Sequence, residues 1–397
     1  MTILRFSRMF TVSLGFLWLL MTVINAEPVA SVHQQGTGTL GTLPPIAPVL
    51  NNPDFECRIG YYTQTNSINK EIFIPNDWQA TISDGAPVIH SARTFFAKSC
   101  TGSAHVERIN LEDSIVMRAQ DLETPPAPGK PFDVAFHQSI SATVGGAYSL
   151  SGWFLSLCGG SAVPSDCPEG IYMAKMLGID PTGGTDINAD SVIWTENRRN
   201  FWEEGKRVGW QQLSVSAVAQ APIITVFARV KSPFRWHGNH AFIDALSLVR
   251  APLSMLTVPI VVTGTDVLVQ WEGLQSPDIA AIAGGTYQLR YDIQAREHVT
   301  DTWTDFLMGQ EAVGSALFPV GCANTVYEFR IRTRAEQPDA PAPAGAWPNH
   351  RYHGVWSDAL PVQIQSQNNN AAEPGELPGP YRLYLPHVET QETRSVC

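Results

Sequence analysis

Short segments in which apolar and polar residues alternate run through most of the chain. Five of them lie before residue 250: Tyr148 to Phe154, Ile171 to Ile179, Gln211 to Ala217, Ile223 to Lys231 and Ala241 to Val249. In a strand, successive side chains point to opposite faces, so a period of two predicts a strand with one face in a core. The length and spacing of these segments predict an antiparallel β-sandwich between Asn51 and Val249.

A second block of strand-like segments lies between Val258 and Ile364. Its segments are Val267 to Trp271, Tyr287 to Tyr291, Val326 to Arg332 and Gly354 to Ser357. Only 16% of the residues are charged, and the chain has 31 Gly and 29 Pro, as expected for short strands joined by turns. The sequence therefore predicts an all-β protein with two antiparallel β-sandwiches and flexible linkers.

The first residues have the layout of a signal peptide. Arg5 and Arg8 precede an apolar run from Met9 to Ile24, and Ala26 suits the position before a cut. We expect cleavage after residue 26; the alternative is an uncleaved membrane anchor. Residues 27–48, rich in Pro, Gly and Thr, predict a flexible leader. No later segment approaches the roughly 20 apolar residues of a spanning helix, so we expect no transmembrane span in the mature chain.

The charge of the chain argues against a nucleic-acid partner. The formal net charge is −11, and removal of 1–26 takes away two arginines and no acids, which gives −11 − 2 = −13. Binding to phosphates requires clustered Lys and Arg, and an acidic surface lacks them.

Six cysteines fit an exported chain. Cys158 and Cys167 flank a loop that a disulfide could close, and Cys57 and Cys100 are the next pair. A zinc site is the alternative, but the chain has no Cys-x-x-Cys. We expect Cys322 to be a buried small apolar residue and leave Cys397 unassigned.

No catalytic arrangement stands out. The sequence offers loop acids but no recognisable pair for glycoside hydrolysis, and we expect solvated loop charges at Asp180, Asp186, Asp190, Glu203 and Glu204. His237 and His240 offer imidazoles for a metal, but in a loop rather than on a helix face. No Gly-x-Ser-x-Gly, phosphate loop or dinucleotide motif is present. We therefore expect no enzyme.

Alternation also predicts where a ligand would bind. It leaves Trp153 on the polar face of its strand and Phe227 with Arg229 on the polar face of another. If these faces coincide, rings and a guanidinium could hold a sugar, with loop residues Trp194, Trp202 and Trp236 at the rim. The alternative is that Trp153 and Phe227 form a second core layer.

The ends of the first block resemble the galactose-binding-like jelly rolls that include carbohydrate-binding modules. The resemblance depends on Asn52 to Glu56 at the start, Gly178 to Asp186 in the middle and Phe242 to Leu248 at the end. It implies a jelly roll over 49–250. It also implies a structural calcium ion held by Glu56 and Asp244, completed by oxygens such as carbonyls near Ser91, although Ala245 replaces a second acid common in the family. The alternative is two ordinary strand-end acids.

The second block resembles a fibronectin type III domain. Trp271 matches the tryptophan of an early strand, Tyr287 and Tyr291 match a Tyr-x-x-x-Tyr strand, and Tyr327 matches the tyrosine corner. The resemblance implies such a domain over 256–366. The chain departs from the family at Cys322 and in a Pro/Ala insertion from Gln337 to His350.

The end of the chain reads as a linker, 367–380, followed by a tail, 381–397. Tyr381 to Val388 resembles the short tails that close secreted proteins of filamentous Chloroflexi-type bacteria, which implies a sorting or surface-attachment signal. The alternative is a frayed or edge-pairing terminus.

These features together predict a secreted or cell-surface attached, non-catalytic glycan-binding or adhesion protein. Its partner would be a polysaccharide or a cell-surface glycan. A structural protein of the cell envelope or sheath, whose sandwiches contact only envelope proteins, is the alternative, and an enzyme with an unfamiliar site ranks third.

Overall fold

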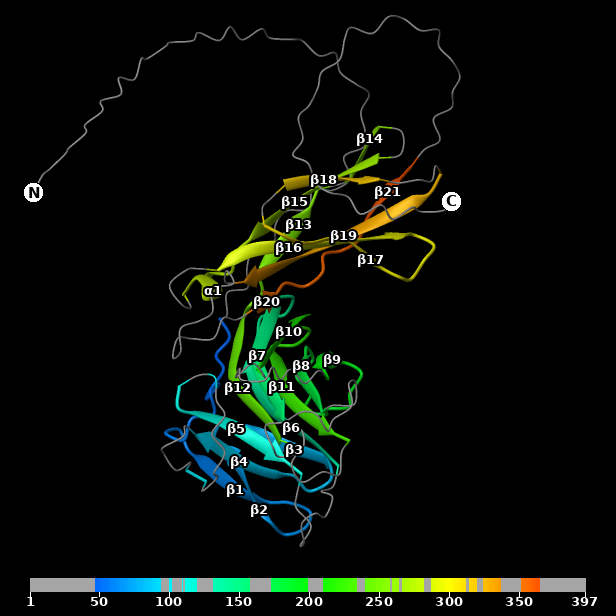
Figure 1. Cartoon of the computed structure of the whole chain (residues 1–397). Coiled ribbons are helices and arrows are strands. Elements are labelled where there is room, and N and C mark those ends of the chain that lie inside the picture. Colours follow the sequence, from blue (N-terminus) through cyan, green and yellow to red (C-terminus); the bar gives the residue numbers. More distant parts are fainter. Residues whose placement is uncertain are drawn as a thin grey trace, which may run out of the picture. The chain divides into compact units, whose positions relative to one another are not determined.

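A computed structural model describes residues 47–93, 100–101, 109, 111–119, 131–157, 173–198, 210–233, 240–257, 259–263, 266–281, 287–311, 314–319, 324–336 and 351–364. All of them belong to one unit, Gly38–Cys397. The described residues form strands β1 to β21 and one short helix, α1 (Pro277–Ala281) (Figure 1). The predicted all-β fold class is confirmed.

The first sandwich consists of two five-stranded antiparallel sheets. Sheet I has the order β10 (Gln211–Val218), β7 (Ala147–Leu157), β12 (His240–Arg250), β5 (Asp113–Arg118) and β4 (Val88–Arg93). Sheet II has the order β3 (Gln79–Asp84), β6 (Phe132–Ser141), β11 (Ile223–Ser232), β8 (Ala174–Asp180) and β9 (Ile193–Asn197). A hairpin of β1 (Tyr61–Thr65) and β2 (Glu71–Pro75) precedes them.

The core of the first sandwich lies between its two sheets. Leu150 and Phe154 of β7 and Val226 and Ala228 of β11 are buried in one cluster, as the period-two pattern predicts. Trp78, whose indole donates a hydrogen bond to the Asn52 carbonyl at 2.9 Å, belongs to the same cluster. The ring therefore fills the core without leaving its N–H unsatisfied.

The second sandwich also has two antiparallel sheets. In sheet III, β13 (Leu253–Leu256) and β14 (Ile260–Thr263) pair with successive parts of β15 (Asp266–Leu274), which also pairs with β18 (Gly314–Pro319). Sheet IV has the order β17 (Thr304–Gln310), β16 (Gln288–Glu297), β19 (Val326–Glu336) and β20 (Arg351–His353), and β21 (Leu360–Gln363) also pairs with β19.

Its core contains the aromatic residues of the second block. Trp271, Tyr291 and Tyr327 are buried together with Phe329 and Ile331. These tyrosines and the tryptophan are the residues that resemble fibronectin type III, but the family assignment itself stays a prediction.

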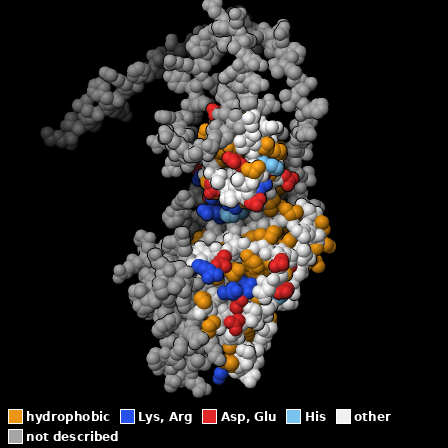
Figure 2. Space-filling view, turned by 90° about the vertical axis from the view of Figure 1, so that its right-hand side faces the viewer, with side chains coloured by type: hydrophobic (Ala, Val, Ile, Leu, Met, Phe, Trp, Pro, Cys, Tyr) orange, Lys and Arg blue, Asp and Glu red, His pale blue; other side chains and the backbone are white. Residues whose placement is uncertain are grey.

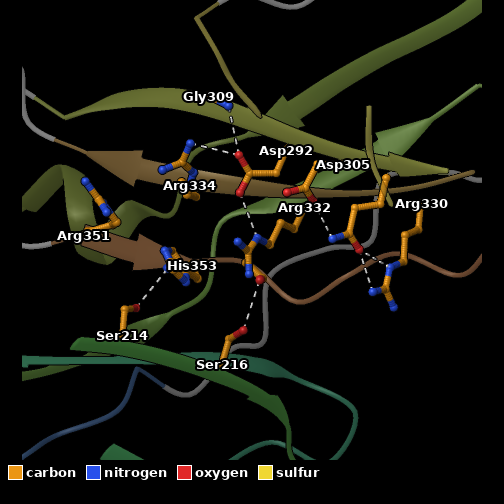
Figure 3. A network of polar contacts seen from close by, with 12 residues as sticks. Ser214, Ser216, Asp292, Asp305, Gly309, Arg330, Arg332, Arg334, Arg351 and His353 are labelled. Carbon is orange, nitrogen blue, oxygen red and sulfur yellow. Dashed lines mark hydrogen bonds and ion pairs between the residues drawn. The ribbon is translucent and has the colours of Figure 1, made fainter. Parts of the chain in front are cut away.

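Strand β20 and helix α1 contact sheet I of the first sandwich. The backbone N–H of His353 donates to Ser214 Oγ at 3.3 Å, and Ser216 Oγ donates to the Gly354 carbonyl at 3.0 Å (Figure 3). Arg250 Nε donates to Asp278 Oδ2 at 2.8 Å. Since Leu213 and Val215 face the core, the two serines point outward, and this part of the outer face of sheet I is covered.

His353 lies where positive charge is concentrated. Burial, together with the charges of Arg332, Arg334 and Arg351, lowers the pKa of His353 to about 3. The imidazole is therefore neutral in the folded protein at pH values where a free histidine takes up a proton.

We predict that His353 makes the folded protein less stable as the pH falls below about 6.5. In that range the unfolded chain binds a proton at this residue and the folded chain does not, so the free energy of unfolding decreases by up to about 1.4 kcal/mol per pH unit down to the folded pKa. Urea unfolding of wild type and His353→Gln at several pH values would show a shallower decrease in the variant. His298→Gln, which alters an imidazole that is 63% exposed in the same sandwich, is the control. Equal slopes for His353→Gln and wild type would contradict the prediction.

Candidate functional site

The outer face of sheet II carries a layer of side chains over β6, β11, β8 and β9. Val226 and Ala228 point into the core, so Phe227 and Arg229 point outward. The strand register places Phe227 beside Gly178, and Gly178 beside Trp194. Three segments distant in sequence therefore meet at one point of this face.

Trp194 lies directly over Gly178. A Cβ atom added to Gly178 would approach ring atoms Cε3 and Cζ3 of Trp194 to 2.6 Å, so no other residue fits without moving the ring. The ring centroid of Phe227 is 5.6 Å from that of Trp194, and the guanidinium carbon of Arg229 is 5.5 Å from the Trp194 centroid. These contacts fix one side of an indole that is half-buried.

Arg229 is held by a bidentate ion pair. Its Nε and Nη2 donate to Oδ1 and Oδ2 of Asp133 at 2.8 and 2.6 Å, and Nη1 donates to the Ile187 carbonyl at 2.8 Å. Burial alone would raise the pKa of Asp133, but hydrogen bonds from Arg229 and Ser83 and the charges of Arg229 and Lys231 lower it. Arg229 is therefore a buried structural cation rather than an open ligand contact.

The segment between β8 and β9 covers part of the same face. Ile187 and Val192 pack on Phe227, which is fully buried. Asp180 shapes the segment: its Oδ1 accepts bonds from the backbone and hydroxyl of Thr182, and its Oδ2 accepts a bond from Ser191 Oγ at 3.1 Å. Our prediction of a solvated charge is wrong for Asp180, which is 1% exposed, because these local donors compensate its burial. Asp186 and Asp190 are exposed, as predicted.

The structure separates the predicted ligand residues. Phe227, Arg229 and Trp194 share the outer face of sheet II, but Trp153 belongs to β7 in sheet I. The prediction that Trp153 and Phe227 lie on one face is wrong, because the outer faces of two stacked sheets point in opposite directions. Phe227 is instead part of a second core layer, as the alternative interpretation of this face predicted. Trp202 and Trp236 lie outside the described residues, as do Glu203, Glu204 and His237.

Sequence reasoning missed Asp133 and Asn188 as parts of this face. Asn188 Oδ1 accepts a bond from Arg229 Nη2 at 3.2 Å. An acid in an alternating strand is a weak signal. The register of β6 against β11 places Asp133 opposite Lys231 and Arg229 opposite Ala135, so Asp133 and Arg229 meet diagonally, and only the side-chain hydrogen bonds identify them as partners. The glycine of the Gly-Ile-Asp stretch at 178–180 was the one sequence signal that another group packs closely against this strand.

A second cluster, the acidic centre, consists of Glu56, Asp113 and Asp244, all buried. Glu56 Oε1 accepts bonds from the backbone N–H groups of Glu112 and Asp113, each at 3.0 Å. Asp113 Oδ2 accepts a bond from the Cys57 N–H, and Asp244 Oδ1 accepts one from the Ala245 N–H at 2.7 Å. Carboxylate oxygens of Glu56, Glu112 and Asp113 lie within 4.8 Å of one another.

The backbone around the acidic centre is strained. Asn52, Phe55, Leu111 and Ala245 have φ angles of 46°, 54°, 45° and 50°, in the left-handed region that L-residues rarely adopt. Each of them lies within four residues of an acid of the cluster. Such strain persists only where the surroundings stabilise it, and it is concentrated at functional sites.

The donor set of the acidic centre fits calcium. Burial raises the pKa of the Tyr61 hydroxyl well above its usual value, and the negative charges of the three acids raise it further. A divalent cation would offset this negative charge, and carboxylate oxygens are the hard ligands that Ca²⁺ takes. Of the two predicted ligands, Glu56 belongs to the group whose carboxylate oxygens lie within 4.8 Å of one another, together with Glu112 and Asp113, which were not predicted. Asp244 is not in that group, and its Oδ2 accepts a bond from the Ile109 N–H at 2.8 Å. Ser91 Oγ lies 3.4 Å from Cys57 Sγ, next to Glu56 in sequence.

The predicted disulfide between Cys57 and Cys100 is confirmed, with a Cα–Cα distance of 5.7 Å. The disulfide therefore joins the chain directly after Glu56 to the segment that follows β4. The predicted pair Cys158–Cys167 lies outside the described residues, as do Cys322 and Cys397. Within the part of the chain that the structure covers, no helix combines the length and the apolar character that crossing a membrane requires.

Comparisons with known proteins identify no family for this chain. No protein-family model matches the sequence, and no curated protein matches it. Among solved structures, the carbohydrate-binding module TmCBM61 in complex with β-1,4-galactotriose aligns with 51% of this chain and 97% of its own length, at 15% identity and a TM-score of 0.30.

The adhesin domain of Epf from Streptococcus pyogenes aligns with 78% of this chain and 99% of its own length, at 11% identity and a TM-score of 0.24. A β-1,2-glucanase from Parabacteroides distasonis aligns with 74% of this chain and 37% of its own length, at 10% identity and a TM-score of 0.26. At these TM-scores the similarities support no conclusion about the function of the chain.

We predict that Phe227→Ala destabilises the first sandwich by about 3 to 5 kcal/mol, the usual result of truncating a buried Phe. The substitution removes the ring on which Ile187, Val192 and Trp194 pack. Chemical unfolding followed by tryptophan fluorescence measures the effect. Ile223→Ala, at an exposed position of the same strand, is the control and should cost far less. A loss below 1 kcal/mol for Phe227→Ala would show that the ring does not act as a core residue.

Proposed function

We propose that this chain is a non-catalytic, glycan-binding or adhesion protein, with Trp194 on the outer face of sheet II as the central contact. One observation carries this proposal: a half-buried indole lies over Gly178 with its sheet side fixed by Phe227 and Arg229. Flat aromatic rings are platforms for the C–H faces of sugars, and Trp combines a large apolar surface with an N–H donor.

The surroundings of Trp194 support a polar ligand. Asn188, Glu196 and Arg198 are exposed, and Glu196 accepts a hydrogen bond from Arg198. Amide, carboxylate and guanidinium groups together offer both donors and acceptors to hydroxyl groups. Since the indole is already fixed by its neighbours, a ligand loses little binding energy to ordering it. The polysaccharide or cell-surface glycan proposed as partner therefore meets a rigid surface.

We predict that Trp194→Ala weakens glycan binding at least tenfold, about 1.4 kcal/mol, with a smaller effect on stability than Phe227→Ala. A glycan array with the full chain identifies the ligand, and calorimetry compares the variants. Gly178→Ala should also weaken binding, because its Cβ displaces the ring without removing it.

Trp153→Ala is the matched control, since it removes a half-buried tryptophan from sheet I. Equal losses for Trp153→Ala and Trp194→Ala would contradict the assignment to sheet II. Failure of the wild type to bind any plant, microbial or host glycan would favour a structural envelope protein.

We also propose that the protein is secreted or attached to the cell surface. The signal-peptide pattern of residues 1–26 supports export. The Cys57–Cys100 disulfide supports an oxidising compartment, because such bonds are rare where thiols are kept reduced.

The acidic centre is proposed to hold a structural calcium ion. Glu56 and Asp244 come from the start and end of the first sandwich, and Asp113 comes from β5. A shared cation would connect these three segments and offset the repulsion of buried carboxylates.

We predict that a chelator lowers the midpoint of thermal unfolding and that added Ca²⁺ restores it. An ion present at about 100 times its dissociation constant stabilises the folded state by about 2.7 kcal/mol. Asp244→Asn should abolish the response, whereas Asp186→Asn, at an exposed acid, should leave it unchanged. Calorimetric scans with and without chelator measure both effects. An unchanged midpoint in the wild type would contradict the calcium site.

A further inference from the structure

The outer face of sheet IV carries a row of arginines. In β19 the side chains of Tyr327, Phe329 and Ile331 face the core, so those of Arg330, Arg332 and Arg334 point outward. Alternate residues of a strand are about 6.7 Å apart, so this row spaces its charges regularly along the strand. On the face that Figure 2 presents, basic and acidic side chains are interspersed with hydrophobic ones.

Two tryptophans lie between these arginines and form what we term the arginine–tryptophan stack. The guanidinium carbons of Arg296 and Arg330 lie 4.5 and 4.2 Å from the ring centroid of Trp303. Those of Arg330 and Arg332 lie 4.6 and 4.7 Å from the centroid of Trp356. Three guanidinium groups thus alternate with two indoles, and Arg330 stands in the middle.

Arg330 differs from its neighbours in the stack because its partner is neutral. Arg296 pairs with Glu328 at 2.7 Å. Arg332 pairs with Asp292 at 2.9 Å (Figure 3). Arg330 donates to Gln294 Oε1 at 2.9 and 2.6 Å, and among the described residues it makes no ion pair. Burial, and then the charges of Arg296 and Arg332, lower its pKa. The centre of the stack therefore holds a guanidinium group that forms no ion pair with a described carboxylate; Asp305 reaches it only through Gln294.

The stack restricts the kind of anion that would fit. Each indole already has two guanidinium groups over its ring, so nucleic-acid bases find no free ring face for stacking. The arginines on either side of Arg330 are paired with Glu328 and Asp292, so the stack lacks the continuous unpaired positive charge that would match a duplex, which carries a charge about every 1.7 Å. A polymer whose carboxylates or sulfates are separated by uncharged sugar atoms needs no such continuous surface. Because stacking holds the Arg330 fork in place, less side-chain entropy is lost on binding.

We propose that the arginine–tryptophan stack binds the carboxylate or sulfate groups of an acidic polysaccharide through Arg330. This site is in the second sandwich and does not depend on the proposed contact at Trp194. The protein then has two glycan-binding surfaces of different chemistry, an aromatic platform on one sandwich and a cationic stack on the other.

Affinity electrophoresis of the full chain in gels containing polygalacturonate or dextran sulfate tests the proposal, with a neutral galactan gel for comparison. Retardation is expected in both acidic polymers and should fall with added salt. Arg330→Gln should weaken it about tenfold. Lys70→Gln removes one positive charge from an exposed position in the first sandwich, away from both proposed sites, and should have no effect. Trp194→Ala should also bind the acidic polymers normally, so failure here is distinguishable from failure of the first site.

A second variant covers the case in which Arg330→Gln does not fold. Asp305 is exposed and accepts a bond from the amide of Gln294 at 2.8 Å, so Asp305→Asn removes a negative charge beside Arg330 and keeps the acceptor oxygen. It should bind the acidic polymers several-fold more tightly. Unchanged binding in Asp305→Asn, unchanged binding in folded Arg330→Gln, or tighter binding of wild type to duplex DNA or to phosphatidylserine vesicles would overturn the proposal.

Discussion

The buried ion pair between Arg229 and Asp133 is the interaction on which the outer face of sheet II depends. Two charges removed from water are tolerated only when their hydrogen-bonding groups are satisfied, and here the carboxylate receives a guanidinium fork while the remaining donors go to Ile187 and Asn188. The pair thus joins β6 to β11 and fixes the segment that follows β8. With that segment in place, Phe227 is enclosed and Trp194 rests on Gly178, so a charged contact positions the aromatic one.

The two sheets of the first sandwich use their outer faces differently. Sheet I is partly covered by contacts with β20 and α1, where Ser214 and Ser216 meet His353 and Gly354. Sheet II keeps a half-buried indole with polar neighbours. The two faces therefore differ in what they leave accessible, although both are built from the same alternating pattern.

Charge is distributed in local groups rather than spread evenly. The acidic centre gathers carboxylates within the first sandwich, next to a disulfide and a strained backbone. The arginine–tryptophan stack gathers guanidinium groups on the second. The net charge of −11 describes neither group. An argument from net charge against nucleic-acid binding therefore does not apply to a single cationic surface on an acidic protein.

Several features followed from the sequence alone, because they depend on neighbours along the chain. The period-two pattern identified the all-β class and the inward residues of β7 and β11, and cysteine usage identified the pair Cys57–Cys100. Glu56 and Asp244 were singled out by the resemblance to jelly rolls, and their role as calcium ligands stays a prediction.

What only the tertiary structure decided was which strands share a sheet and which residues stand opposite each other. Trp153 and Phe227 both point outward, yet they lie on opposite sides of the sandwich because β7 and β11 belong to different sheets. The pairing of Arg229 with Asp133, the contact of Gly178 with Trp194 and the stack around Arg330 likewise join residues far apart in sequence. Alternation specifies the direction of a side chain within its own strand, whereas its partner depends on register and sheet order, which non-local packing determines.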